Sequence, residues 1–400
     1  MAEPPVRVLS PADLAATAGR VRVGGRVVVA GDGRVRIADA LGTVDVELEV
    51  DLAPGSLVIV EGTASTEGLQ DAELLWQQRC PEPRGDDDPG RFLFGGVGDA
   101  LRARSRVLQG LRDYFAEQDF LEIDAPQLLE TPALDVHVDA VSADEGWLST
   151  SPEFQLKRLL SGGLPRIYSL GHVFRGDPTG VDHEREFMLL EWYRAFDTVA
   201  AVQRDTELLV ERVLSLLGAC PVLTRADGRR VDVRPPYERT SVRELFRRYA
   251  GVDDAVDLAA SDEARYFELW VERVEPGLEG RDTPVFVERF PARHASLAAR
   301  DSDDPSVAAR FELYLAGKEL CNGFQELTCP LEQRARFERD RQERARAGKA
   351  VHAIDERLLS ALAAGMPPAA GNALGVDRLL ALGLGRSAIQ SVMAFPRAGL

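Results

Sequence analysis

The chain has 400 residues, of which 45% are hydrophobic, and its formal net charge at pH 7 is −17. This length and composition suffice for one large core and a smaller domain, which excludes an intrinsically disordered chain. The negative net charge disfavours a wide nucleic-acid-binding surface and favours a basic partner. The alternative interpretation is that the charge only keeps the protein soluble.

The N-terminal residues carry no targeting signal, since Met1–Pro5 lacks a basic start followed by an apolar run. The longest apolar runs, such as 57–60, are far shorter than a membrane span. We therefore expect a cytoplasmic protein. The four cysteines form no C-x-x-C pair, so the sequence indicates neither a zinc site nor a disulfide framework.

Residues 1–80 show the pattern of a small antiparallel β-barrel. Valines alternate with other residues between Arg20 and Gly62, and Gly31–Gly33 marks a turn. Residues 81–92 combine prolines with an acidic run, a composition that packs poorly and predicts a linker. The remaining residues, 93–400, are expected to form one large domain.

That large domain mixes helices and strands. The spacing of apolar residues predicts a helix over 97–119 and a strand over 120–123. Further strands are expected within 164–194 and 310–324, and further helices at 204–217 and 356–364, which indicates an α+β domain. The charged run 334–346 is typical of a helix with a solvated face, to which we assign no function.

Arg175 and Arg378 are the most informative residues of the chain. Arg175 ends an apolar strand that pairs with the next strand in a predicted hairpin, and Arg378 follows 371–375, a predicted glycine-rich turn that leads into an apolar helix ending near Leu384. An isolated arginine is usually part of a surface ion pair. Here two arginines lie beside backbone segments that a ligand can approach closely. This arrangement instead suggests that both arginines bind one polyphosphate.

These segments resemble the class II aminoacyl-tRNA synthetases, a family that activates amino acids with ATP. The hairpin at 166–193 is similar to motif 2, the segment 371–379 to motif 3, and the helix and strand at 97–126 to motif 1. The resemblance covers 93–400 and is strongest to the lysyl branch. Within that branch, 150–160 and 319–328 are most similar to the paralogues that modify elongation factor P.

The resemblance implies an antiparallel sheet flanked by helices, preceded by a small OB-like barrel. It also implies a homodimer, because motif 1 forms the dimer interface in this family, although an amphipathic core helix would show the same pattern. ATP and Mg²⁺ are the implied cofactors, with Arg175, Arg378 and Glu319 as catalytic residues and Glu319 as the metal ligand. The implied ATP contacts are Arg175, Gly176, Asp177, Glu184, Glu319, Leu320, Asn322, Gly375 and Arg378.

The same resemblance implies a pocket for a lysine-type amino acid, whose ammonium groups need paired carboxylates when buried. The implied substrate contacts are Ser151, Pro152, Glu153, Tyr193, Glu326 and Ala373. Ala373 stands where tRNA-charging lysyl enzymes usually have glycine, which fits a rearranged substrate such as (R)-β-lysine. Taken singly, each of these glutamates would more often be a solvated side chain.

The sequence departs from the family pattern at several positions. Asp177 is one methylene shorter than the usual glutamate, and Glu184 replaces an asparagine in the motif 2 loop. Arg293 and His294 replace serine and glutamine, so that His294 is either a substrate contact or, as is more common for a lone histidine, a structural residue.

The hypothesis is ATP-dependent activation of a lysine-type amino acid and its transfer to a lysine ε-amine of elongation factor P. One alternative is tRNA aminoacylation, but residues 1–90 hold 8 arginines and no lysine against 16 acidic residues, with Trp76 as the one aromatic residue. Single-strand-binding barrels need a basic groove and aromatic platforms, which makes tRNA an unlikely partner here. The other alternative is a non-catalytic paralogue that binds an amino acid or a protein.

Overall fold

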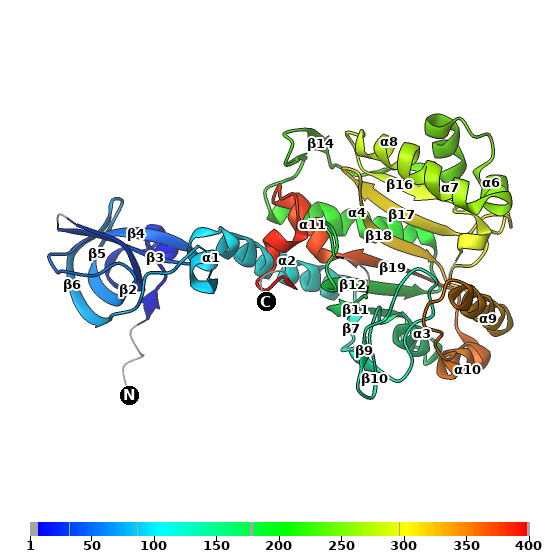
Figure 1. Ribbon diagram of the computed structural model, residues 1–400, viewed down its shortest axis with the longest axis horizontal. Helices are drawn as coiled ribbons and strands as arrows, with labels where there is room; N and C mark the ends of the chain where they lie inside the picture. The colour runs from blue at the N-terminus through cyan, green and yellow to red at the C-terminus, as the bar shows by residue number, and fades with distance from the viewer. Residues whose placement is uncertain (1–6, 32, 86, 177–178, 296, 398–400) are drawn as a thin grey trace. The chain divides into compact units, whose positions relative to one another are not determined.

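The computed structural model describes residues 7–31, 33–85, 87–176, 179–295 and 297–397 (Figure 1). The chain divides into two compact units, Met1–Ser105 and Arg106–Leu400. The linker at 81–92 stays a prediction. Its last residues, from Asp88 onward, are helical. No helix among the described residues is long and apolar enough to cross a membrane.

The first unit contains a small β-barrel. Its strands follow the order β1-β2-β3-β4-β6-β5, and β2 pairs again with β5, which closes the sheet. The strands are β1 (Val8–Leu9), β2 (Gly19–Gly31), β3 (Arg34–Asp39), β4 (Gly42–Glu47), β5 (Leu57–Ser65) and β6 (Gly68–Gln78). Alternate valines such as Val23, Val27 and Val60 are fully buried, because successive strand residues point to opposite faces. The predicted small barrel is confirmed.

Two helices follow the barrel strands, α1 (Asp88–Phe94) and α2 (Val97–Glu117), which confirms the predicted helix at 97–119. The C-terminal half of α2 buries Leu111, Tyr114 and Phe115 in the core of the second unit. Phe115 stacks on Tyr168 with ring centroids 4.2 Å apart. This face of α2 therefore packs within its own chain.

The second unit is built on an eight-stranded sheet in the order β15-β16-β17-β18-β19-β12-β11-β7. All neighbouring pairs are antiparallel except β15–β16 and β11–β7. The strands are β7 (Leu121–Glu122), β11 (Arg166–Phe174), β12 (Glu186–Ala195), β15 (Glu238–Ser241), β16 (Val285–Glu288), β17 (Arg310–Leu315), β18 (Lys318–Gln325) and β19 (Ala369–Gly375). The predicted α+β class and the hairpin β11–β12 are confirmed.

Helices flank this sheet in groups (Figure 1). They are α3 (Glu153–Ser161), α4 (Val199–Leu216), α5 (Val242–Leu245), α6 (Ala255–Ser261), α7 (Glu263–Leu269), α8 (Glu275–Glu279), α9 (Pro330–Arg346), α10 (Glu356–Gly365) and α11 (Val376–Gly383). Figure 1 shows α6, α7 and α8 beside β16, whereas α3, α9 and α10 pack together. Short strands complete the unit: β8 (Leu128–Leu129), β9 (Ser142–Ala143), β10 (Gly146–Leu148), β13 (Val222–Thr224) and β14 (Arg230–Asp232).

One local prediction was wrong. The predicted glycine-rich turn at 371–375 is part of the central strand β19. A side chain at Gly371 would place Cβ 2.3 Å from Tyr193 Cε1, so the glycine allows close packing within the sheet. The charged run 334–346 forms most of α9 and has the predicted solvated face, with Arg334, Arg339 and Arg346 exposed, while Arg336 and Arg344 are buried.

Candidate active site

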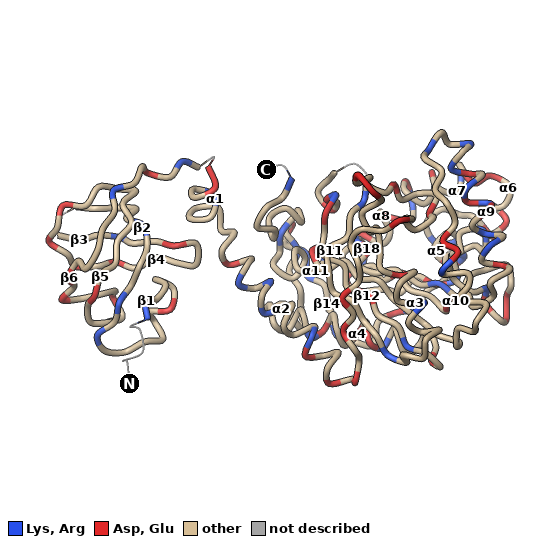
Figure 2. The backbone as a smooth tube through the Cα atoms, turned by 90° about the horizontal axis from the view of Figure 1, so that it is seen from below, with Lys and Arg blue, Asp and Glu red and all other residues tan. Residues whose placement is uncertain are grey.

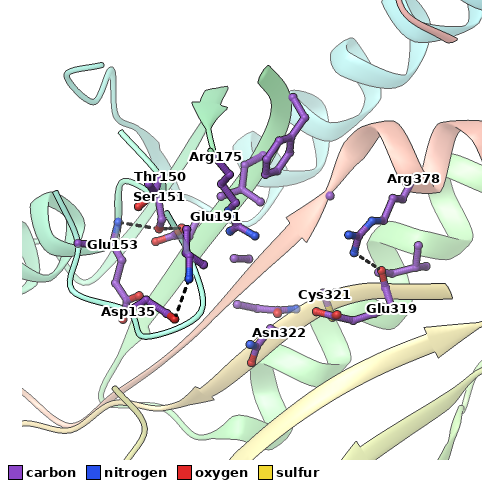
Figure 3. Close-up of a pocket in the computed structure, with 18 of the residues that line it drawn as sticks. Asp135, Thr150, Ser151, Glu153, Arg175, Glu191, Glu319, Cys321, Asn322 and Arg378 are labelled. Atoms are coloured by element: carbon purple, nitrogen blue, oxygen red, sulfur yellow. Dashed lines mark hydrogen bonds between the residues drawn. The ribbon is translucent and has the colours of Figure 1, made fainter. Parts of the chain in front are cut away.

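A cavity of about 450 Å³ lies over the central strands β18, β19 and β12. Figure 3 shows Arg378 and Glu319 on one side of it, with Ser151, Glu153 and Glu191 on the other. The cavity brings together most of the residues that the sequence singled out. These are Ser151, Glu153, Arg175, Glu184, Tyr193, Glu319, Leu320, Asn322, Glu326, Ala373, Gly375 and Arg378.

Two of the predicted residues that the structure describes, Pro152 and Gly176, do not line the cavity. Pro152 is buried and caps α3, and it therefore places Glu153 without contacting the cavity itself. The backbone N–H of Gly176 donates to the carbonyl of Asp139 at 2.6 Å. Asp177 lies outside the described residues.

Arg175 enters the cavity directly after β11. Its backbone N–H donates to the carbonyl of Arg185 at 2.8 Å, which closes the base of the loop between β11 and β12. The guanidinium carbon lies 5.1 Å from the ring centre of Phe187, within the range of a cation–π contact. The Phe187 ring also lines the cavity and offers a flat surface beside a cation.

Arg378 approaches from the first turn of α11, where β19 ends. Its Nη1 donates to the backbone carbonyl of Glu319 at 2.8 Å and its Nε to the carbonyl of Asp182 at 3.1 Å. Its Nη2 lies 2.9 Å from His183 Nε2. Burial and the nearby Arg378 lower the pKa of His183, which keeps the imidazole neutral at pH 7 so that it can accept this hydrogen bond. Arg378 therefore ties strand β18 to the loop that follows Arg175.

Glu319 and Asn322 face the cavity from β18, and Leu320 is buried between them. Asn322 Oδ1 accepts a hydrogen bond from Arg310 Nε at 3.0 Å, which fixes the orientation of the amide. Among the described residues, no group of three His, Cys, Asp or Glu side chains is arranged to hold a metal ion. A single carboxylate such as Glu319 still fits Mg²⁺, which is usually bound by one or two carboxylates together with phosphates and water.

Behind the lining of the cavity, a buried lysine lies between two of the lining carboxylates. Lys157 Nζ lies 2.6 Å from Glu153 Oε1 and 2.5 Å from Glu326 Oε2. Burial by itself lowers the pKa of Lys157, but the two carboxylates outweigh burial and hold the pKa above its usual value. The carboxylates predicted to bind the substrate are therefore already paired with a cation of the chain itself.

A third carboxylate, Glu191, lies next to this group. It accepts hydrogen bonds from Ser151 Oγ at 2.6 Å and from the Tyr193 hydroxyl at 2.8 Å. Ser151 Oγ also accepts from the backbone N–H of Glu153 at 3.1 Å, which fixes the start of α3. Ser151 and Tyr193, both predicted substrate contacts, thus hold Glu191 in place.

Burial dominates the ionisation of these carboxyl groups. It raises the pKa of Glu326 to about 8, because the charge of Lys157 only partly offsets the loss of water. Burial and the neighbouring Glu153 raise the pKa of Glu191 to about 7. When all three carboxyl groups are ionised and Lys157 is protonated, this group of side chains carries two net negative charges.

Ala373 lies in β19 between two polar neighbours. It is opposite Glu191 of β12 on one side and opposite Asn322 of β18 on the other. Its methyl group therefore separates the carboxylate end of the cavity from the end that holds Glu319. This position suits a residue that shapes the substrate between its reacting carboxyl group and its amines.

Glu184 is held by the C-terminal segment. Gln390 Nε2 donates to Glu184 Oε1 at 2.9 Å and to the carbonyl of Gly180 at 2.9 Å. The carboxylate that replaces the family's asparagine is therefore buried with a partner of its own. The loop between β11 and β12 is fixed from both sides, by Gln390 and by Arg378.

A buried arginine of α9 holds the loop at 135–139, which lines the cavity. Arg344 Nη1 donates to the carbonyls of Asp135 and Val138 at 2.6 and 2.9 Å, and its Nη2 donates to Asp139 Oδ1 at 2.9 Å. Its Nε donates to the carbonyl of Ala350 at 2.7 Å. Lys349 adds to this support, since its Nζ donates to the carbonyl of Val136 at 3.1 Å and lies 3.5 Å from Asp139 Oδ1.

Lys157, Glu191 and Arg344 were not predicted from the sequence to belong to the site. The sequence spacing indicated two of them. Lys157 is four residues after Glu153 on one helix, so the two side chains share a face of that helix. Glu191 is two residues before Tyr193 on one strand, so these two side chains share a face of the sheet. Arg344 had no such signal. His294 does not line this cavity, and its Nε2 lies 2.9 Å from Glu263 Oε1.

The arrangement separates two kinds of chemistry. Arg378 places positive charge at the end that holds Glu319, and Arg175 enters the cavity near Glu191 (Figure 3), so that an anion such as a polyphosphate can be stabilised by both without reorganisation. The buried carboxylates place negative charge at the other end, where an amine can bind. The cavity is suited to hold a phosphate-bearing molecule and an amino-bearing molecule side by side.

Comparisons with known proteins agree with this description. A family model described as tRNA synthetases class II (D, K and N) matches residues 95–399. The chain is 37% identical over 322 residues to the elongation factor P–(R)-β-lysine ligase of Pasteurella multocida, a match that covers 74% of this chain and 94% of the relative. The proteins of the same name from Proteus mirabilis and Edwardsiella ictaluri are 37% and 38% identical, each over 310 residues, with the same coverage.

Proposed function

Because this chain belongs to the class II tRNA synthetase family, we propose that it activates a lysine-type amino acid with ATP and transfers it to a lysine ε-amine of elongation factor P. The expected amino acid is (R)-β-lysine. The observation that carries the proposal is the shared cavity, which Arg175 and Arg378 line together with Glu153, Glu191 and Glu326. The names of the relatives support the same reaction.

In the first step, a carboxylate oxygen of the amino acid bonds to the α-phosphorus of ATP and the bond to pyrophosphate breaks. Negative charge grows on the phosphoryl oxygens, and Arg175 stabilises it from the end of β11. Arg378 holds the terminal phosphate. Glu319 would bind Mg²⁺, which supplies positive charge to the phosphates.

The amino acid is held by its amines. The two ammonium groups of a diamino acid balance the two negative charges that remain when Lys157 is paired with the carboxylates. In the second step, the acceptor amine bonds to the acyl carbon, the bond to AMP breaks and the amine loses its proton to solvent. The products are an amide and AMP.

We further propose a cytoplasmic homodimer. The sheet of the second unit ends at β7, a strand of two residues whose Leu121 is 52% exposed. A sheet edge with an exposed apolar side chain is suited to contact another chain. Analytical ultracentrifugation checks this: a single species at the monomer mass at micromolar concentration would contradict it.

The arginines of the barrel argue against tRNA as the acceptor. Arg20 and Arg22 both pair with Glu61, at 3.0 and 2.5 Å, and Arg36 pairs with Asp45 at 2.7 Å. Figure 2 shows basic and acidic positions interspersed over the first unit. Arginines that are neutralised in this way contribute little to binding a phosphate backbone.

The test of the proposal is amino-acid-dependent exchange between ATP and pyrophosphate. We expect exchange with (R)-β-lysine, weaker exchange with α-lysine and none with norleucine, which lacks the side-chain amine. Exchange with none of the amino acids would favour the non-catalytic paralogue. Exchange with a neutral amino acid would contradict the role given to the carboxylates.

A further inference from the structure

A second cavity, of about 520 Å³, adjoins the candidate active site. The two cavities share Asp135, Val138, Glu319 and Asn322 as lining residues. The second cavity lies against α7, α8, α9 and β17, and none of the roles assigned above involves it. It therefore reaches the candidate active site at the end that holds Glu319.

Arg310 of β17 forms the wall between the cavities. Its Nε donates to Asn322 Oδ1 at 3.0 Å and its Nη2 to Glu312 Oε1 at 2.6 Å. Its Nη1 donates to the carbonyl of His294 at 2.8 Å. Because these bonds occupy the guanidinium on three sides, the wall is a fixed part of the fold.

Carboxylates dominate the lining of the second cavity. It has seven, against three arginines. Within the described part of the chain, the carboxylate groups of Asp135, Glu275, Glu319 and Glu343 form no salt bridge with an arginine or lysine, although the backbone carbonyls of Asp135 and Glu319 accept hydrogen bonds from Arg344 and Arg378. Burial raises the pKa of Asp340, another lining residue, to about 6. Negative charge that the chain does not neutralise favours a positively charged occupant.

Aromatic rings line the same cavity, among them Tyr266, Phe267 and Trp270. Phe267 is 40% exposed, whereas Tyr266 is almost fully buried. Aromatic faces attract ammonium groups and pack against the methylene chain of a lysine. The lining therefore matches a long aliphatic amine better than it matches a phosphate or a carboxylate.

We propose that the second cavity is the entrance for the acceptor, a lysine side chain of a protein together with its neighbouring basic residues. The ammonium group enters between α7 and α9, passes the aromatic rings and reaches the acyl carbon beside Glu319 and Asn322. This inference rests on the proposed function, since it assumes an activated amino acid in the first cavity. An RNA acceptor is disfavoured by the same carboxylates.

The test removes negative charge from the second cavity alone. Glu275 and Glu343 line the second cavity and not the first, so the double variant Glu275→Gln/Glu343→Gln keeps the shape and loses two charges. The matched control is Glu272→Gln/Glu338→Gln, which makes the same change on neighbouring turns outside both cavities. Glu343→Lys reverses one charge and should give a stronger effect than Glu343→Gln.

Two rates are measured for each protein: ATP–pyrophosphate exchange with (R)-β-lysine, and transfer to elongation factor P at a concentration below saturation. We expect unchanged exchange in all variants, at least tenfold slower transfer in the cavity variants, and transfer within twofold of wild type in the control. Unchanged exchange also shows that the variants are folded.

Other outcomes are distinguishable. Equal transfer rates in the cavity variants and in the control would contradict the proposal that the second cavity is the entrance for the acceptor. A loss of ATP–pyrophosphate exchange in the cavity variants would contradict it too, because the carboxylates would then take part in the activation step. If the wild-type protein shows exchange but acylates tRNA and not the factor, both the proposed acceptor and this entrance are wrong. If it shows no exchange, the proposed function fails first.

Discussion

Arg175 and Arg378 enter the cavity from segments about two hundred residues apart, and each is fixed by backbone contacts of its own. We predict that Arg175→Ala lowers the rate of ATP–pyrophosphate exchange by at least about 10²-fold, the usual loss when a transition-state donor is removed. Arg166, at the exposed start of the same strand, provides the control. A loss below tenfold, or an equal loss in Arg166→Ala, would show that Arg175 has no part in the activation step.

The buried carboxyl groups predict a pH dependence. With pKa values of about 8 for Glu326 and about 7 for Glu191, both groups are largely protonated at pH 6 in the free enzyme. An ammonium group binds the ionised form better, so substrate binding must release protons. We expect the KM for (R)-β-lysine to fall as the pH rises from 6 to 8.

Calorimetry in buffers of different ionisation enthalpy measures the same linkage directly. Binding of the amino acid at pH 7 should release protons, and Glu326→Gln should reduce the number released. A KM that is constant or rises with pH, without proton release, would mean that these carboxylates are ionised before the substrate arrives.

At the scale of elements, strand β19 depends on a glycine that allows the Tyr193 ring to approach. Alanine at Gly371 would place Cβ 2.3 Å from Tyr193 Cε1 and 2.8 Å from Glu326 Oε1. Such overpacking costs about 1–3 kcal/mol of folding stability. Because Tyr193 and Glu326 would have to move, we also expect the KM for the amino acid to rise. Gly31→Ala is the control, because its Cβ would meet no heavy atom within 4 Å. An unchanged KM in Gly371→Ala would contradict the assigned position of the amino acid.

Helix α9 fixes the wall of both cavities through Arg344. Replacing Arg344 by alanine leaves the carbonyls of Asp135 and Val138 without their donor, at a cost of about 1–3 kcal/mol. We expect a lower melting temperature and slower exchange, whereas Arg346→Ala, at an exposed position of the same helix, should change neither. Normal exchange by Arg344→Ala would show that the loop does not need this support.

Much of this element-scale organisation was predictable, because it depends on local patterns. Alternating valines predicted the barrel, and the apolar spacing of 97–119 predicted α2. The position of Arg344 was not predictable, since a helix that is polar all round does not reveal which arginine meets a distant loop. The turn predicted at 371–375 was wrong because glycine also occurs in strands where another side chain packs closely.

At the scale of the whole molecule, the resemblance to the family predicted twelve site residues that line one cavity in the structure. The sequence does not show which of their side chains pair with one another. The buried Lys157 and the second cavity arise only when strands and helices far apart in sequence meet. Which roles the lining residues have remains a prediction.

The net charge of −17 belongs to this scale too. It opposes association with RNA and favours a basic protein. We predict no retardation of tRNA in a gel at physiological salt, with a tRNA-charging lysyl enzyme as the positive control. A salt-sensitive complex at low micromolar concentration would contradict this prediction and would favour tRNA as the acceptor.

The most direct test of the central claim is the intact mass of elongation factor P after incubation with this protein, ATP and (R)-β-lysine. The account predicts a gain of one lysyl residue on a single lysine side chain, dependent on ATP and absent with Arg175→Ala. ATP–pyrophosphate exchange under the same conditions, with no gain of mass on the factor, would contradict it.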